Sequence, residues 1–160
     1  MLHGGNTKNL LLCLARYPGK VNAAQMYRTG VELQTEKNPN LLIVDDSAII
    51  RKMIMTALRP LNPVFREASS GLEALEQVML RQYDCITLDL NMPDMHGLEF
   101  LRFVRSHQHF NDIPILVITT QKENSIRDQV LSAGADAFLI KPFQPQDILT
   151  EVKSLLGGDD

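Results

Sequence analysis

The sequence predicts a doubly wound α/β fold, with a five-stranded parallel sheet and five helices. Three observations support this prediction: short continuous apolar runs, helical periodicity between those runs, and a length that suits one domain. The chain has 160 residues, of which 44% are hydrophobic and 22% are charged. A chain of this size and composition can bury a core of ordinary extent.

Five segments have the composition of strands. Four are almost entirely apolar, which is typical of strands buried on both faces of a parallel sheet. The segment at residues 64–67 has a weaker strand pattern and follows Pro63. In chain order the five predicted strands are residues 41–44, 64–67, 85–88, 115–118 and 137–140.

Apolar residues recur at helical spacing after each predicted strand, over residues 49–57, 72–79, 98–104, 126–131 and 148–155. At the start of the second of these helices, Ser70 and Glu73 have the spacing of a capping box. The fourth should stop near Gly134 and the fifth near Gly157. Strands that alternate with helices predict right-handed crossovers, with functional groups at the carboxyl ends of the strands.

The charge distribution divides the chain. Residues 1–39 carry five basic and two acidic side chains, whereas residues 40–160 carry 11 basic and 17 acidic ones. We expect residues 1–39 to be a weakly ordered extension or a docking segment. Residues 40–157 should form the folded domain, and residues 158–160 a short tail.

Composition excludes several classes of protein. The net charge of −3 and the pI of about 5.8 provide no positive field for nucleic acid. No apolar run reaches the roughly 18 residues that span a bilayer. The two cysteines, Cys13 and Cys85, cannot form a disulfide framework. We therefore expect a cytoplasmic protein that binds neither nucleic acid nor membrane.

Charged and hydroxyl side chains follow the predicted strands. Asp45 and Asp46 come after the first strand, Asp89 after the third, Thr119 at the end of the fourth and Lys141 after the fifth. These strand ends should converge, which brings three carboxylates and one ammonium group together. Such like charges are costly unless a cation neutralises them, and carboxylates favour Mg²⁺. The sequence therefore predicts a Mg²⁺ site suited to a transferring phosphoryl group.

Asp89 stands alone at the end of the central strand, so we assign it as the nucleophile that accepts phosphate. Mg²⁺ would bridge Asp46 and Asp89, with the backbone carbonyl of Asn91 as a further ligand and Asp45 acting mainly through water. Two more side chains would hold phosphoryl oxygens, namely Lys141 and Thr119.

Four segments together resemble the receiver domain of two-component response regulators: LLIVDDS, ITLDLNMPDMHGLEFL, PILVITT and ADAFLIKPF. The resemblance runs from about Asn40 to Leu156 and implies the flavodoxin-like strand order 2-1-3-4-5. It implies that Asp89 accepts phosphate from a histidine kinase or phosphotransfer protein. It also implies that Thr119 and Phe138 form a conformational switch and that the Lys141–Pro142 peptide bond is cis.

The nearest subtype resembles stand-alone receivers of the CheY kind, which signal by protein contact to a downstream target. In that family the signalling surface corresponds to residues 125–133, 138–140 and 145–156, and a homodimer can form there. In the family, the positions that match Asn91 and Gln121 flank the line of water attack on the phosphoryl group. Thr120 stands where the family commonly has a smaller residue, and we expect Asn91, Thr120 and Gln121 to tune dephosphorylation. The expected protein is not an enzyme, because it catalyses only its own phosphorylation and dephosphorylation.

Three alternatives use related chemistry. A haloacid-dehalogenase-like phosphatase would need a second aspartate where Asn91 stands. A flavin mononucleotide carrier would need a phosphate loop where Asp45 and Asp46 stand. A constitutive receiver-fold interaction module, not switched by phosphorylation, remains the alternative reading. One departure from the family is His96, which stands where Asp or Asn usually caps the third helix.

Overall fold

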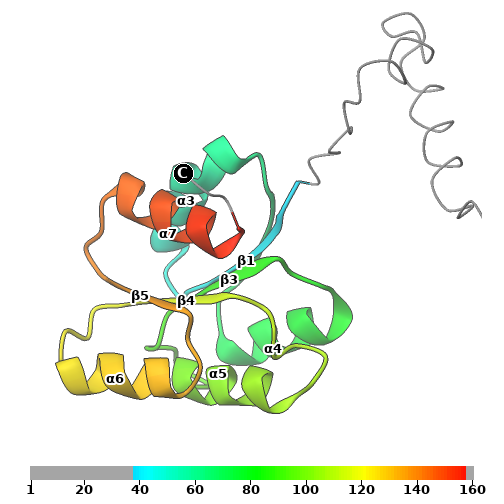
Figure 1. Cartoon of the computed structure of the whole chain (residues 1–160), viewed down its shortest axis with the longest axis vertical. Coiled ribbons are helices and arrows are strands. Elements are labelled where there is room, and N and C mark those ends of the chain that lie inside the picture. The colour runs from blue at the N-terminus through cyan, green and yellow to red at the C-terminus, as the bar shows by residue number, and fades with distance from the viewer. Residues whose placement is uncertain (1–37, 158–160) are drawn as a thin grey trace, which may run out of the picture. The chain divides into compact units, whose positions relative to one another are not determined.

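The computed structural model describes residues 38–157. The predictions for residues 1–37 and for residues 158–160 lie outside this range. A five-stranded parallel sheet lies between two layers of helices (Figure 1). The strands, in sequence order, are β1 Asn40–Val44, β2 Val64–Ala68, β3 Cys85–Leu88, β4 Ile115–Thr119 and β5 Ala137–Ile140.

The sheet order is β2-β1-β3-β4-β5, and every neighbouring pair is parallel. Helices α3 and α7 cover one face, and α4, α5 and α6 cover the other (Figure 1). These five helices are α3 Ala48–Leu58, α4 Gly71–Leu80, α5 Gly97–Ser106, α6 Asn124–Ser132 and α7 Pro145–Leu155. The predicted doubly wound fold and its strand order are therefore confirmed.

Each face of the sheet has its own hydrophobic core, because successive side chains of a strand point to opposite faces. In β1, Leu42 and Val44 pack with the helices α4, α5 and α6, whereas Leu41 and Ile43 pack with α3 and α7. All four side chains are at most 1% exposed. This double burial explains why the central strands read as continuous apolar runs rather than as alternating ones.

Side chains cap the first turns of α4 and α7, and at α4 one hydrogen-bond partner differs from the predicted capping box. Ser70 accepts a hydrogen bond from the backbone N–H of Glu73 at 3.1 Å, as a capping box requires. The Glu73 carboxylate, however, accepts from the N–H of Ser69 at 2.7 Å rather than from that of Ser70. At α7 the Asp147 carboxylate accepts from the N–H of Gln144 at 2.9 Å. Asp147 thus supports Gln144, which is a weak cap residue by type.

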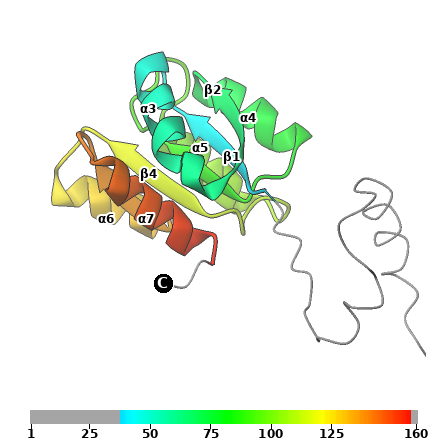
Figure 2. The same ribbon diagram turned by 90° about the horizontal axis from the view of Figure 1, so that it is seen from above.

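A short 3-10 helix, η1 Arg59–Leu61, extends α3 and was not predicted. It ends at Asn62, whose backbone is left-handed with φ of 50°. Asn tolerates this conformation better than most residues. The chain then enters β2, which pairs with β1 and is labelled near it and α4 in the second view (Figure 2). Within residues 38–157 no helix has the length and apolar character to cross a membrane.

Candidate functional site

Three carboxylates meet where β1 and β3 end. One oxygen atom from each of Asp45, Asp46 and Asp89 lies within 4.8 Å of the others. Asp45 and Asp89 are buried, at 1% and 4% exposure, whereas Asp46 is exposed. The strand order places β1 beside β3, so the two strand ends deliver these groups to one point, as the sequence predicts.

Lys141 reaches this carboxylate cluster from the end of β5. Its Nζ atom lies 2.5 Å from Asp45 Oδ2 and 3.1 Å from Asp89 Oδ1. Its backbone N–H donates to the carbonyl of Thr119 at 2.8 Å, which ties the residue to the end of β4. The following peptide bond, to Pro142, is cis. The ammonium group therefore neutralises only part of the negative charge gathered here.

The surroundings of Asp89, the phosphoacceptor candidate, disfavour its ionised form. Burial raises the pKa of the Asp89 carboxyl, the neighbouring Lys141 lowers it, and the charges of Asp45 and Asp46 raise it again, with a net upward shift. Three carboxylates against one ammonium group leave an excess of negative charge. Clustered carboxylate oxygens are hard donors, so these residues fit Mg²⁺ by both charge and ligand type.

A hollow of about 420 Å³ opens over the cluster. Its polar lining includes the three aspartates, Lys141 and the rim residues Asn91 and Thr120. Ile50, Met53 and Phe143 line its apolar wall and were not predicted from the sequence. They lie on α3 and on the loop before α7, so only the packing of these elements brings them to the site.

The rim of the hollow is closed by side-chain hydrogen bonds. Gln121 Nε2 donates to Asn91 Oδ1 at 2.7 Å, and Asn91 Nδ2 lies 3.4 Å from Thr120 Oγ1. Thr119 is fully buried, and its Oγ1 accepts from the backbone N–H of Gln121 at 3.3 Å. The loops after β3 and β4 are thus linked by side chains at the hollow that the carboxylates line.

Phe138 lies apart from this cluster, on β5. It is half-buried and packs against the core under α4, α5 and α6. Its register partner in β4 is Val117, two residues before Thr119. The aromatic ring and the hydroxyl group of the expected switch are therefore on neighbouring strands.

Gly97 is a structural part of the site that the sequence analysis did not single out. A Cβ atom built on Gly97 would stand 2.2 Å from the carbonyl oxygen of Asp89. The N–H of Gly97 donates to the carbonyl of Leu90 at 3.0 Å. The first residue of α5 must therefore be glycine for the helix to start directly against the backbone of the phosphoacceptor candidate.

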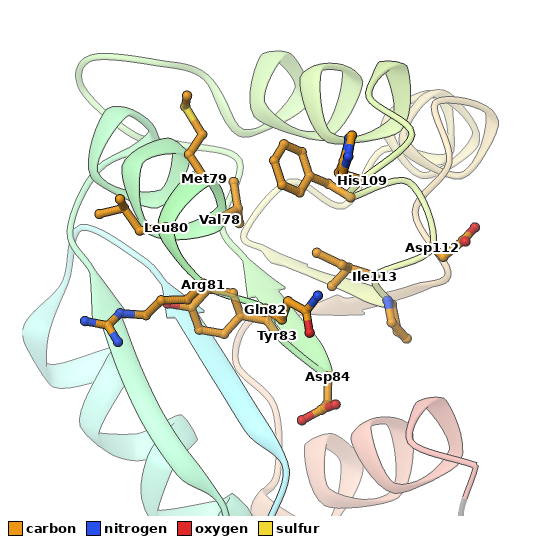
Figure 3. A pocket seen from close by; sticks show the side chains of 12 residues that line it. Val78, Met79, Leu80, Arg81, Gln82, Tyr83, Asp84, His109, Asp112 and Ile113 are labelled. Atoms are coloured by element: carbon orange, nitrogen blue, oxygen red, sulfur yellow. The ribbon is translucent and has the colours of Figure 1, made fainter. Parts of the chain in front are cut away.

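A larger hollow, of about 560 Å³, lies at the amino ends of β3 and β4, away from the carboxylates. Figure 3 shows Met79 and Leu80 from the end of α4 beside it, with Ile113 and His109 across from them. Its charged lining residues are Arg81, Asp84 and Asp112, and His109 also lines it. None of the predicted site residues lines this hollow, so size alone does not identify the functional site.

Comparison with known proteins agrees with this geometry. The family model described as the response regulator receiver domain matches residues 41–153. The chain belongs to the response regulator receiver family. Receiver domains are phosphoacceptors of two-component signalling that interact with histidine kinases or phosphotransfer proteins and bind Mg²⁺ at an acidic pocket.

Individual relatives cover the receiver domain. The transcriptional regulatory protein SrrA of Staphylococcus aureus is 37% identical over 116 residues, which are 72% of this chain and 47% of the relative. The chain thus matches about half the length of this curated relative.

Solved structures resemble the domain along most of their own length. A putative response regulator from Chloroflexus aurantiacus has a TM-score of 0.72 at 36% identity, and the match covers 76% of this chain and 99% of that one. The chemotaxis response regulator CheY4 of Vibrio cholerae has a TM-score of 0.70 at 33% identity, covering 74% of this chain and 99% of that one. The predicted resemblance to CheY-like receivers is therefore confirmed.

Proposed function

We propose that Asp89 accepts the phosphoryl group from the phosphohistidine of a histidine kinase or phosphotransfer protein. The observation that carries this proposal is the convergence of the buried Asp89 carboxylate with Asp45, Asp46 and Lys141. An Asp89 oxygen attacks phosphorus, the P–N bond to the histidine breaks, and the released imidazole takes a proton from solvent. The product is an aspartyl phosphate.

Different residues of the site would bind Mg²⁺ and the phosphoryl group. Asp46, Asp89 and the backbone carbonyl of Asn91 would hold Mg²⁺, with Asp45 acting mainly through water. When bound, Mg²⁺ supplies positive charge that stabilises the transferring phosphoryl group. Lys141, already 3.1 Å from Asp89, would pair with a phosphoryl oxygen. Thr119 would turn its hydroxyl toward another.

The phosphoryl group would be lost by hydrolysis at the same site. Water attacks phosphorus, the P–O bond to Asp89 breaks, and inorganic phosphate leaves. Asn91, Thr120 and Gln121 would tune this hydrolysis, because their hydrogen bonds link the loops that border the hollow. The chain is thus a self-modifying phosphoacceptor that acts on no external metabolite.

The proposed output is a change of one surface. When Thr119 moves toward the phosphoryl group, Phe138 would rotate inward on the neighbouring strand and remodel the face formed by α6, β5 and α7. Leu131 and Ile140 are exposed on these elements, at 37% and 38%. This face would bind a downstream protein or a second copy of the chain.

The domain organisation follows the same proposal. Residues 40–157 would act as the receiver, with residues 1–39 as an extension and 158–160 as a tail. The protein would work in the cytoplasm without contacting nucleic acid or membrane through this domain. The buried free thiol of Cys85 is compatible with that reducing compartment. Stand-alone action of the CheY kind stays a prediction.

The phosphorylation step is tested by intact mass spectrometry after incubation with acetyl phosphate and Mg²⁺. We expect the mass of one added phosphoryl group on the wild-type chain. Asp89→Asn and wild-type protein with excess chelator should gain none. Mass gain by Asp89→Asn, or equal gain without a divalent cation, would contradict the proposal.

The signalling step is tested separately by amide NMR spectra with and without Mg²⁺ and beryllofluoride. Resonances of α6, β5 and α7 should shift in the wild-type chain. The same resonances should shift less in Phe138→Ala. If beryllofluoride binds at Asp89 but shifts only the residues around the pocket, the chain is a constitutive interaction module instead.

A further inference from the structure

Arg51 lies next to the acidic pocket without being part of it. This residue is on the first turns of α3, five positions after Asp46, and its side chain is 14% exposed. We propose that Arg51 is a positioning residue that holds the acidic pair in the geometry needed for Mg²⁺ binding, with Glu67 fixing Arg51 in turn. This inference rests on the proposed function.

The guanidinium group binds the backbone of both acidic residues. Arg51 Nη1 donates to the carbonyl oxygen of Asp45 at 2.7 Å and lies 3.4 Å from that of Asp46. Arg51 Nε donates to Glu67 Oε2 at 2.7 Å. A single planar group thus connects the end of β2 with two consecutive peptide units between β1 and α3.

The backbone contact matters most for Asp46. Asp45 has other supports, because its carboxylate accepts from the N–H of Ser47 at 2.8 Å and pairs with Lys141. Asp46 is exposed, and no hydrogen bond or ion pair holds its carboxylate among residues 38–157. The position from which its side chain extends is set by the peptide units on either side, which Arg51 anchors.

The arrangement leaves the negative charge of the cluster in place. Three carboxylates and one ammonium group carry a formal net charge of −2 at this edge of the sheet. A guanidinium group stays ionised at all ordinary pH values and offers its N–H donors in a rigid fork. Because Glu67 pairs with Arg51, the two together add no net charge to the cluster. Arg51 contacts only backbone oxygens of Asp45 and Asp46, so it takes no carboxylate oxygen of theirs away from a cation.

The chain contains a matched control for this arrangement. Arg105 also joins backbone carbonyls to a carboxylate: it donates to Gly134 at 2.7 Å, to Asn111 and Ile113 at 3.0 Å each, and to Asp136 at 2.8 Å. Its side chain is 18% exposed. These contacts lie at the end of α5 and the amino ends of β4 and β5, away from the pocket.

The test measures Mg²⁺ dissociation constants by calorimetry on the full-length chain, well below each variant's melting temperature. Arg51→Met should raise the constant about tenfold, in the range seen when groups behind metal ligands are removed. Arg105→Met should lower the melting temperature comparably but leave the constant within about twofold of wild type. Glu67→Gln should raise it about threefold, because Arg51 loses its charged partner.

The outcomes separate the two proposals. If folded Arg51→Met binds Mg²⁺ like wild type, or if Arg105→Met weakens binding equally, Arg51 does not position the pocket. Should Arg51→Met fail to fold, Arg51→Lys and Glu67→Gln decide in the same assay, and wild-type affinity in both overturns the inference. A wild-type chain that binds no Mg²⁺ contradicts the proposed function itself, and the inference with it.

Discussion

The ionisation of Asp89 costs the folded chain free energy. Its pKa is raised because burial and two neighbouring carboxylates outweigh Lys141. The folded state therefore holds the Asp89 proton more tightly than the unfolded state, whose carboxyl titrates near its ordinary value of about 3.9. This contribution to stability is present below that value and is lost as the pH rises through the folded-state pKa.

Asp89→Asn should consequently raise the melting temperature at pH 7 by about 3 °C in the absence of divalent cations. The difference should shrink as the pH falls below the folded-state pKa, because Asp89 is then neutral in the wild-type chain too. Thermal unfolding monitored by circular dichroism from pH 3 to 8 measures this. Asp128→Asn, on the exposed side of α6, should show no such pattern, and equal curves for both variants would refute the account.

Thr87 makes a second residue-scale prediction. Its Oγ1 atom is buried in the middle of β3 and has no hydrogen-bond partner among residues 38–157. Thr87→Val removes this unsatisfied group without changing the shape, so it should raise the free energy of unfolding by about 1 kcal/mol. Denaturant unfolding gives the value.

Thr119→Val is the matched control for that measurement, because the Thr119 hydroxyl accepts a hydrogen bond from Gln121. The same change should there be neutral or destabilising. Stabilisation at Thr119 with none at Thr87 would show that the unsatisfied hydroxyl is not the cause.

Sequence reasoning found the charged members of the site because strand ends in a parallel sheet meet at one edge. Asp45, Asp46, Asp89 and Lys141 could be placed together from this rule alone. It could not find Arg51, whose contacts depend on how the first turns of α3 approach β2. It also missed the apolar wall of the hollow, since such residues look like ordinary core in a sequence.

The start of α5 packs directly against the backbone of Asp89. Gly97→Ala would put a Cβ atom 2.2 Å from Asp89 O and 2.8 Å from Leu90 Cα, both backbone atoms that can move only together. We expect a loss of about 1–3 kcal/mol in the free energy of unfolding. Phosphorylation by acetyl phosphate should slow in parallel, because the carboxylate shifts with its backbone.

Gly157→Ala serves as the comparison for Gly97→Ala. Its Cβ atom would meet nothing within 4 Å, and only its left-handed φ of 78° opposes the change. The cost should be about 1 kcal/mol, with no effect on phosphorylation. Wild-type phosphorylation by a folded Gly97→Ala chain would contradict this account of α5.

The cap of the same helix is weak. His96 Nδ1 accepts from the N–H of Leu98 at 3.3 Å, a long hydrogen bond from an uncommon cap residue. His96→Asn should raise the free energy of unfolding by about 0.5–1 kcal/mol at pH 7, without adding charge near the carboxylates. Denaturant midpoints provide the measurement. His109→Asn, in the exposed loop after α5, should change nothing, and a similar gain there would remove the cap as the explanation.

At the level of elements, all five strands and five helices could be predicted, because burial on both faces gives the strands continuous apolar runs. The 3-10 helix at Arg59–Leu61 could not, since it depends on how the last turn of α3 tightens before Asn62. The partner of Glu73 was also missed. Whether its carboxylate meets Ser69 or Ser70 depends on local dihedral angles that residue types alone do not determine.

In the proposed function, the whole molecule couples a pocket at one edge of the sheet to an outer face. Lys141 connects the carboxylates to β5, and Thr119 connects the rim loops to β4. Both strands continue into the proposed signalling face of α6, β5 and α7. Phosphorylation can favour one conformation of that face only through contacts that differ between the two states.

The most direct test of the central claim is to locate the modified residue. The full-length chain is incubated with acetyl phosphate and Mg²⁺, reduced with borohydride, which converts an aspartyl phosphate to homoserine, and mapped by peptide mass spectrometry. The account predicts homoserine at position 89 alone, and none when the divalent cation is chelated. Homoserine at position 45 or 46, or no modification at Asp89 in the presence of Mg²⁺, would contradict it.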